Sequence, residues 1–419
     1  MYSLMEKLFP ICRSITGNGV RKTLKIINNE IPLKIYEIPT GTQVYDWKIP
    51  KEWNIKDAYV KNSKGKKIID FKVSNLHILN YSIPVKRSIC LSELKKYLHT
   101  LPKQPESIPY LTTYYKENWG FCISQKQYDE LKEDTYEVFI DSSLTFGSLT
   151  YGEFFLKGTS NEEVLFSCYV CHPSMCNDNL SGVVLLTQLA KILQKRKTKY
   201  SYRFLFIPET IGAISWLYKN EKSIKKIKHG LIVTCVGDSG NFTYKKTRKG
   251  DSSIDNIVIK VLEESKKAYQ TVDFFPSGSD ERQFSSPGFD LPIGSLMRTM
   301  YAKFPEYHTS KDDLNFVNSK NLEESLEKYL KIIEILETDV KYISTNQKCE
   351  PQLGNRGLYD MIGGKQAEGI NKMAVFWLLN LSDGNHSIRD IMKKSNIDQN
   401  TLNKSAEILI KFKLLKRIL

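Results

Sequence analysis

The chain has 419 residues, 41% of them hydrophobic, and a formal net charge of +14 at pH 7. This composition excludes a globally disordered chain, and the length suggests about two or three domains. No apolar run approaches the ~20 residues of a membrane span, and the first residues lack the pattern of a signal peptide, so we expect a cytoplasmic protein without a membrane partner. The lysines lie in several separate tracts, so charge alone does not establish nucleic-acid binding.

The first part of the chain predicts an α/β domain that is interrupted by a small insertion. Residues 1–38 have the pattern of a helix followed by a strand. Residues 39–134 contain short strand-like runs, turns and aromatic side chains, which favours an inserted, mostly β domain. Over residues 135–345, apolar strands alternate with amphipathic helices, which is typical of an α/β domain with a central sheet. Within it, we expect residues 151–158 and 163–170 to be paired strands.

The last part of the chain predicts a separate helical module. Residues 344–357 have the composition of a linker, and residues 350–419 contain three predicted helices joined by short turns. Asp398 is placed to cap the third helix, and the arrangement is typical of a winged-helix or helix-turn-helix module. Asn400 and Lys404 could contact base edges, but the module is only moderately basic. We therefore favour a protein interaction, such as formation of a homo-oligomer, over nucleic-acid binding.

The segment Cys168–His172, with the sequence CYVCH, allows more than one interpretation. It matches the short pattern of haem attachment, and its cysteines are conceivable soft metal ligands. Both interpretations are disfavoured. Haem attachment of this type needs an export route, strand alternation places Cys168 and Cys171 on opposite faces, and no second C-x-x-C completes a four-cysteine site. We therefore expect His172 and Asp178, rather than the cysteines, to carry the chemistry.

Titratable side chains recur directly after the predicted core strands. His172, Glu209 and Asp238 each follow an apolar strand, Asp178 lies in the loop before the next helix, and His308 comes later in the chain. Taken singly, each is better explained as a hydrogen-bonded loop residue, a helix cap or a turn residue than as a ligand. However, ligands collect at the carboxyl ends of strands in open α/β sheets, and imidazoles with carboxylates suit zinc or a similar divalent ion. Together they predict a metal site.

Four short segments carry a resemblance to a known family. In chain order they are HPSMCNDNLSG, IPETIGAISW, SGSDERQF and YHTSKDDLNFV. They resemble the ordered motifs of the co-catalytic zinc exopeptidases, which include bacterial aminopeptidases and glutamate carboxypeptidases, over residues 135–340 and the first 38. With its inserted β domain and winged-helix-like C-terminal module, the whole chain is similar to a bacterial group of aminopeptidase-like proteins often associated with surface-polysaccharide gene sets. The resemblance implies a mixed central sheet flanked by helices.

By position, the resemblance also implies a set of zinc ligands. His172, Asp178 and Asp238 would form one metal site. Asp178 would bridge to a second metal site, where His308 is also a ligand. We expect one zinc ion held by a subset of these residues, because the second site departs from the family pattern.

That departure is Thr210, which stands where the family has the glutamate ligand of the second ion. A neutral hydroxyl replaces a carboxylate poorly, so the second site is expected to be weak or absent. Its neighbour Glu209 matches the general base. Asp280, Glu281 and Arg282 match a segment near the substrate pocket, where the acidic groups would hold a free α-amino group or the arginine would hold a carboxylate. The sequence leaves both options open.

The residues and the resemblance together imply a metal-dependent hydrolase of amide bonds. The first reading is a zinc aminopeptidase in which Glu209 takes a proton from activated water. One alternative is an amidase or deacylase that acts on an acylated amino sugar in surface-polysaccharide metabolism. The other is a binding or regulatory protein built on a degenerate peptidase domain, an alternative that Thr210 keeps open.

Overall fold

Residues 1–356, 358 and 371–418 are described by the computed structural model, which divides into two compact units, Met1–Lys331 and Ile332–Leu419. The first unit contains an α/β domain and an inserted β domain, and the second is a small mixed module. No helix in this described part is long and apolar enough to cross a membrane.

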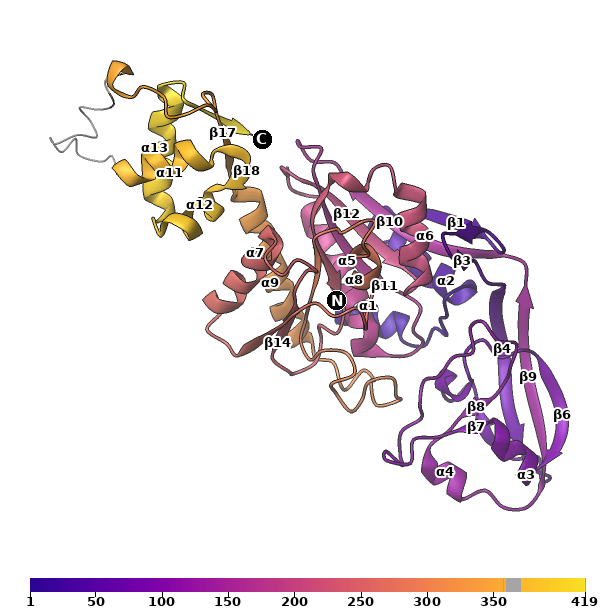
Figure 1. The fold of residues 1–419 in the computed structure, drawn as a ribbon. Helices are drawn as coiled ribbons and strands as arrows, with labels where there is room; N and C mark the ends of the chain where they lie inside the picture. Colours follow the sequence, from indigo (N-terminus) through magenta and orange to yellow (C-terminus); the bar gives the residue numbers. More distant parts are fainter. Residues whose placement is uncertain (357, 359–370, 419) are drawn as a thin grey trace. The chain divides into compact units, whose positions relative to one another are not determined.

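The α/β domain, at the centre of Figure 1, is built on one eight-stranded sheet. Its strand order is β1-β10-β12-β11-β13-β16-β14-β15. Its strands are β1 (Lys34–Pro39), β10 (Ser148–Leu156), β11 (Glu163–Tyr169), β12 (Ser201–Ile207), β13 (Ile227–Val233), β14 (Phe242–Lys245), β15 (Tyr269–Val272) and β16 (Ile293–Met297). Strands β12, β11, β13 and β16 run parallel, whereas β1 with β10, β10 with β12, and β14 with β16 are antiparallel. The expected mixed sheet is confirmed.

The predicted pairing of residues 151–158 with residues 163–170 is wrong. β12 lies between the two strands, antiparallel to β10 and parallel to β11. Every residue of β11 is buried, and β11 has parallel neighbours on both edges. A strand that is buried along its whole length belongs in the middle of a sheet rather than in a hairpin.

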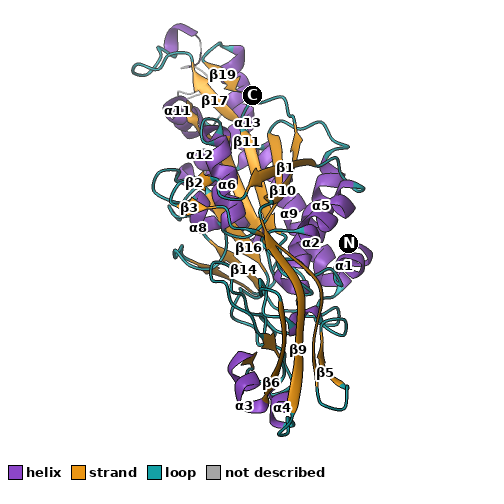
Figure 2. Cartoon of the chain, turned by 90° about the vertical axis from the view of Figure 1, so that its right-hand side faces the viewer, coloured by secondary structure: helices purple, strands orange, loops and turns teal. Residues whose placement is uncertain are grey.

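Helices cover both faces of the sheet. They are α1 (Tyr2–Leu8), α2 (Asn18–Asn28), α5 (Ser181–Leu193), α6 (Ile211–Asn220), α7 (Ser253–Glu264), α8 (Glu281–Phe284) and α9 (Ser319–Thr338). Figure 2 shows α5 on one side of the sheet and α6 and α8 on the other. Leu165, Leu205 and Ile232 form one apolar cluster with Ile214 and Trp216 of α6, because alternate strand residues point to the same face.

The inserted domain centres on a four-stranded antiparallel sheet with the order β5-β4-β9-β6. Its elements are β2 (Gln43–Val44), β3 (Trp47–Lys48), β4 (Glu52–Lys61), β5 (Lys67–Asp70), β6 (Val85–Cys90), α3 (Leu91–Leu94), β7 (Leu98–His99), β8 (Phe121–Cys122), α4 (Gln125–Asp129) and β9 (Thr135–Thr145). β9 pairs along β4 from Glu137 to Thr145, so the inserted sheet extends past the predicted boundary at residue 134.

The C-terminal unit combines helices with a small sheet. Its described elements are β17 (Lys341–Ser344), α11 (Lys372–Leu381), β18 (Asp383–Ser387), α12 (Ile388–Ser395), α13 (Gln399–Lys411) and β19 (Leu415–Ile418), and the sheet order is β18-β17-β19. The three predicted helices are present, and the Asp398 side chain caps α13 by accepting the N–H of Thr401 at 3.0 Å. Because β17 pairs with β18 and β19, this unit includes residues before 350, and the segment 344–357 lies inside it. Gly357 of that segment lies outside the described residues.

Candidate metal centre and active site

The carboxyl ends of β11, β12 and β13 lie at the same edge of the sheet, since these strands are parallel. His172 follows β11 and Glu209 follows β12, while Asp178 lies in the turn Cys176–Leu180 that leads into α5. His308 lies between β16 and α9, in the loop that returns to this edge. Four of the five residues expected at the centre therefore converge.

His172, Asp178 and His308 form the first donor group. One donor atom from each lies within 4.8 Å of the other two. His308 Nε2 is 3.0 Å from Asp178 Oδ2, yet neither atom forms a well-aligned hydrogen bond with any described residue. A buried polar atom without a partner is costly, and two imidazole nitrogens with a carboxylate are a zinc-type donor set. These residues therefore fit a divalent metal ion.

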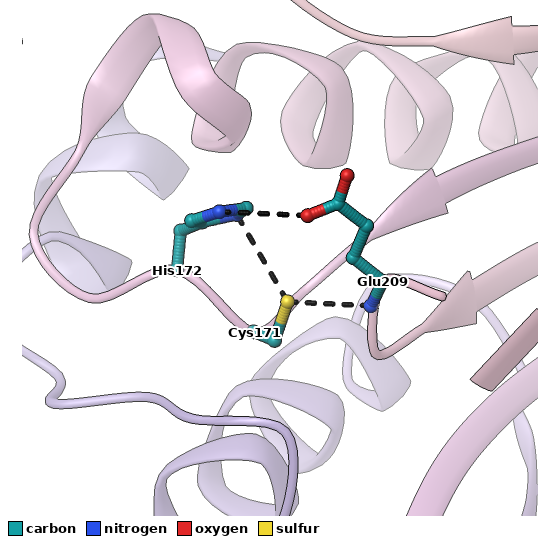
Figure 3. Close-up of side chains that lie close together, drawn as sticks. All are labelled: Cys171, His172 and Glu209. Atoms are coloured by element: carbon teal, nitrogen blue, oxygen red, sulfur yellow. Dashed lines mark hydrogen bonds and ion pairs between the residues drawn. The ribbon is translucent and has the colours of Figure 1, made fainter. Parts of the chain in front are cut away.

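Cys171, His172 and Glu209 form a second donor group that shares the same histidine (Figure 3). The Glu209 Oε2 atom lies 3.7 Å from His172 Nε2, and the Cys171 Sγ atom lies 3.9 Å from His172 Nδ1. The Glu209 backbone N–H also donates to the Cys171 sulfur at 3.3 Å. Cys171 therefore lines the site, a role that the sequence interpretation did not give it, whereas Cys168 is buried within β11.

Burial and charge set the protonation of the first group. Burial lowers the pKa of His172 to about 4, because the charged imidazolium is disfavoured away from water. A neutral imidazole is the form that binds metal. Burial alone would raise the pKa of Asp178, but the neighbouring imidazoles His172 and His308 outweigh it and lower this pKa to about 2. The site thus holds an ionised carboxylate between imidazoles.

Glu209 has the opposite electrostatic environment. Burial, followed by the nearby carboxylates Asp280 and Asp178, raises the pKa of Glu209 well above its ordinary value. Burial also raises the pKa of Asp280 to about 7, against the hydrogen bond from Thr210. A carboxylate with a raised pKa, beside a carboxylate with a lowered pKa, is suited to accepting and releasing protons.

Two side chains outside the predicted set hold Asp178 in place. Asp312 accepts the backbone N–H groups of Asn177 at 2.5 Å and of Asp178 at 2.9 Å. The Tyr169 hydroxyl donates to Asp178 Oδ1 and lies 2.6 Å from Thr234 Oγ1. Asp312 belongs to the same sequence segment as His308, so its spacing was a usable signal. Tyr169 had no signal beyond its place at the end of β11.

The structure does not bring Asp238 into either donor group. Asp238 Oδ1 accepts the Gly240 N–H at 2.6 Å and the Thr299 hydroxyl at 2.7 Å, and Oδ2 accepts the Asn177 side chain at 2.9 Å. Its oxygens are thus occupied by protein donors, and Asp238 braces the loop after β13. Cys235 lies nearer the end of that strand, where burial and then the charge of Asp178 raise the pKa of its thiol.

Thr210 connects Glu209 to the predicted pocket segment. It has a φ of +62°, a left-handed conformation that is unfavourable for a β-branched residue. Its backbone N–H donates to Asp280 Oδ1 at 2.7 Å, and its hydroxyl accepts from Arg282 Nη2 at 2.9 Å. The side chain in the position of the missing glutamate is therefore engaged with Arg282.

Glu281 lies away from the pocket, contrary to the expectation for this segment. It forms an ion pair of 2.6 Å with Lys245, and neither side chain is exposed to solvent. Ser295 and Tyr301 also donate hydrogen bonds to its carboxylate, both at 3.1 Å. The donors around Glu281 saturate it, so it braces α8 rather than binding a substrate.

The inserted domain forms a wall of the site. The Tyr110 N–H donates to the His308 carbonyl at 2.8 Å, and Pro109 forms a β-bridge with Thr309. The Tyr110 ring lies 5.3 Å from the His172 ring and 5.2 Å from the His308 ring, both centroid to centroid. Sequence reasoning missed this contact because it joins residues far apart in the chain.

A pocket of about 200 Å³ opens beside Glu209. Its lining is completed by Ile15, Trp47, Tyr114, Tyr115, Cys171, Thr210, Ile211 and Arg282. Drug-sized ligands usually occupy roughly 300–1,000 Å³, so this pocket suits one small chemical unit.

Comparisons with known proteins identify the family and the fold of the chain. A family model described as "Domain of unknown function (DUF4910)" matches residues 2–339, and a "winged helix-turn-helix" model matches residues 341–417. A Clostridium acetobutylicum protein is 57% identical over 418 residues, covering 100% of this chain and 96% of its own length. Its name is "Putative polysaccharide biosynthesis protein with aminopeptidase-like domain".

Two solved structures are also similar. A crystal structure from Clostridium acetobutylicum, described as a "putative peptidase", has a TM-score of 0.86 and 56% identity, with coverage of 100% of this chain and 96% of the other. A zinc aminopeptidase from Bacillus subtilis has a TM-score of 0.57 and 12% identity, with coverage of 80% and 93%. The second likeness shows the fold alone, which is that of an aminopeptidase.

Proposed function

Because the chain belongs to the DUF4910 family and has an aminopeptidase-like fold, we propose that it is a metal-dependent hydrolase of amide bonds. The observation that carries this proposal is the group His172, Asp178 and His308 beside Glu209, in which Asp178 Oδ2 and His308 Nε2 lie 3.0 Å apart and neither forms a well-aligned hydrogen bond with a described residue. Removal of an N-terminal residue is the first activity to test, since solved relatives of this fold are named zinc aminopeptidases.

Each side chain of the site has a separate role in the proposed reaction. His172, Asp178 and His308 would hold one zinc ion, which when bound supplies a Lewis acid that activates water and polarises a carbonyl. Glu209 accepts a proton from the attacking water on its carboxylate and later donates it to the leaving nitrogen. Tyr110 packs against both imidazoles and keeps bulk water from that side of the centre. Asp312 and Tyr169 fix the orientation of Asp178.

A second candidate substrate is an acylated amino sugar, for which the protein would be a deacylase. Three aromatic side chains of the inserted domain, Trp47, Tyr114 and Tyr115, line the small pocket. Rigid aromatic faces of this kind suit a ring-shaped ligand. The name of the Clostridium acetobutylicum relative, which mentions polysaccharide biosynthesis, points in the same direction.

The decisive variant is Glu209→Gln, which keeps the shape of the side chain but cannot accept a proton. Zinc-loaded wild type should hydrolyse at least one member of a panel of aminoacyl amides and N-acetylated amino sugars. Glu209→Gln should lower kcat by about 10²–10⁴-fold, with bound zinc unchanged by elemental analysis. The matched control is Glu264→Gln on the exposed face of α7, which should change neither quantity.

The other outcomes separate the alternatives. A Glu209→Gln protein that loses zinc would make Glu209 a ligand, and one that keeps full activity would remove it from the reaction. A zinc-loaded wild type that binds panel members without cleaving any of them would favour the binding or regulatory protein over the enzyme.

A further inference from the structure

Asp280, Glu281 and Arg282, at the start of α8, lie in different environments. Glu281 is paired with Lys245 in a solvent-free site and is therefore neutralised. Asp280 uses one oxygen to accept the Thr210 N–H and does not line the pocket. Arg282 alone of the three lines the pocket beside Glu209. The segment therefore presents a cation to the substrate, although two of its three residues are acidic.

The Arg282 guanidinium has N–H groups that form no hydrogen bond with a described residue. Its Nη2 donates to the Thr210 hydroxyl and its Nε is buried, whereas its Nη1 is not fully buried and donates to no described residue. Arg282 also forms no ion pair with any residue in the described part of the chain, although Asp280 and Glu209 lie in its neighbourhood. A guanidinium is always charged and has several N–H donors in a fixed plane, so unused donors at a pocket indicate a missing acceptor.

The rest of the pocket restricts what that acceptor can be. Trp47, Tyr114 and Tyr115 provide apolar faces, and Glu209 is committed to the reaction in the proposed mechanism. The pocket volume of about 200 Å³ leaves room for one small unit that carries the anion. A planar carboxylate matches the guanidinium fork in two parallel hydrogen bonds.

We propose that Arg282 is a specificity-determining residue that binds a carboxylate of the amide substrate, so that the preferred substrates are acidic. This inference rests on the proposed hydrolase function and names its substrate class. A dipeptide with a free terminal carboxylate and an acidic N-acylated amino compound both satisfy it. A substrate recognised mainly through a free amino group does not, because Glu281 is paired with Lys245 and neither Asp280 nor Glu281 lines the pocket.

Binding of small probes tests this directly in the zinc-loaded full chain. The probes are N-acetylglycine, its neutral analogue N-acetylglycinamide, and the cationic glycinamide, each titrated by calorimetry. N-acetylglycine should bind wild type about 10–100-fold more tightly than either other probe, as expected for a charge-assisted pair. Arg282→Gln should remove this preference, and Arg282→Lys should restore part of it, since lysine keeps the charge but not the fork. The control Arg248→Gln, at an exposed ion pair with Asp290, should leave it intact.

Each contrary result has a distinct meaning. Equal binding of the acid and the amide to wild type would overturn the inference without any variant, even if Arg282→Gln failed to fold. A preference for the acid that survives in Arg282→Gln would place the carboxylate on the metal instead. Tight binding of glycinamide would assign the pocket to an amino group. If zinc-loaded wild type hydrolyses no member of the substrate panel but still binds N-acetylglycine preferentially, the hydrolase proposal is wrong and the carboxylate subsite is retained.

Discussion

Asp178 and Asp238 are both buried carboxylates near strand ends of the same sheet, but they differ in how many hydrogen bonds they accept. Asp238 accepts hydrogen bonds on both oxygens from Gly240, Thr299 and Asn177. Asp178 accepts one from Tyr169 on Oδ1, while Oδ2 faces His308 without a well-aligned hydrogen bond. The two residues share their type and their position near a strand end. Their hydrogen bonds distinguish Asp238, which stabilises a loop, from Asp178, which is a candidate ligand.

The largest expected effect is on zinc affinity. Asp178→Asn should weaken zinc binding by at least about 100-fold. Even substitution of a residue that only hydrogen-bonds to a metal ligand typically lowers metal affinity by about 10–100-fold. Asp238→Asn, the matched change at the braced carboxylate, should leave zinc affinity nearly unchanged. Competition titration with a chelator measures both. Equal losses in the two variants would show that Asp238 turns to bind the ion and would erase the distinction.

The next effect concerns the imidazole beside Asp178 in chelator-treated protein. The pKa of His172 is about 4 in the folded chain, below the ~6.5 of an unfolded histidine, so the unfolded state binds the proton first. The free energy of unfolding should therefore fall as the pH drops from about 6.5 to about 4, by up to about 3 kcal/mol.

Denaturant unfolding at a series of pH values measures this loss. His172→Asn should flatten the dependence in that window. His386→Asn, in the C-terminal unit, is the matched control and should leave it in place. A wild-type curve that is already flat over this window would contradict the buried, neutral state of His172.

The smallest effect is structural. Asp238→Asn replaces an acceptor oxygen with an amide that faces N–H donors, and so should lower the free energy of unfolding by about 1–3 kcal/mol. Thermal unfolding of the chelator-treated protein measures it. A variant as stable as wild type would mean that the hydrogen bonds around Asp238 contribute little, and the contrast with Asp178 would then rest on zinc affinity alone.

The sequence predicted the backbone positions of the site better than the directions of its side chains. Apolar strands followed by polar residues located His172, Asp178 and Glu209 at one edge, because parallel strands must end together. The same rule could not tell that Glu281 turns to Lys245, since the pairing depends on a residue 36 positions away in the chain. It also could not place β9 in the inserted sheet, because its register with β4 is a long-range contact.

The backbone pairing between the inserted domain and the loop of His308 joins two parts of the fold into one structural unit. Ile108 and Tyr110 exchange hydrogen bonds with Ser310 and His308, so the insertion supplies part of the scaffold that holds a candidate ligand. Removal or exchange of residues 39–134 would therefore leave the His308 loop without the backbone segment that pairs with it. The inserted domain and the α/β domain therefore cannot be exchanged as independent modules without rebuilding the His308 loop.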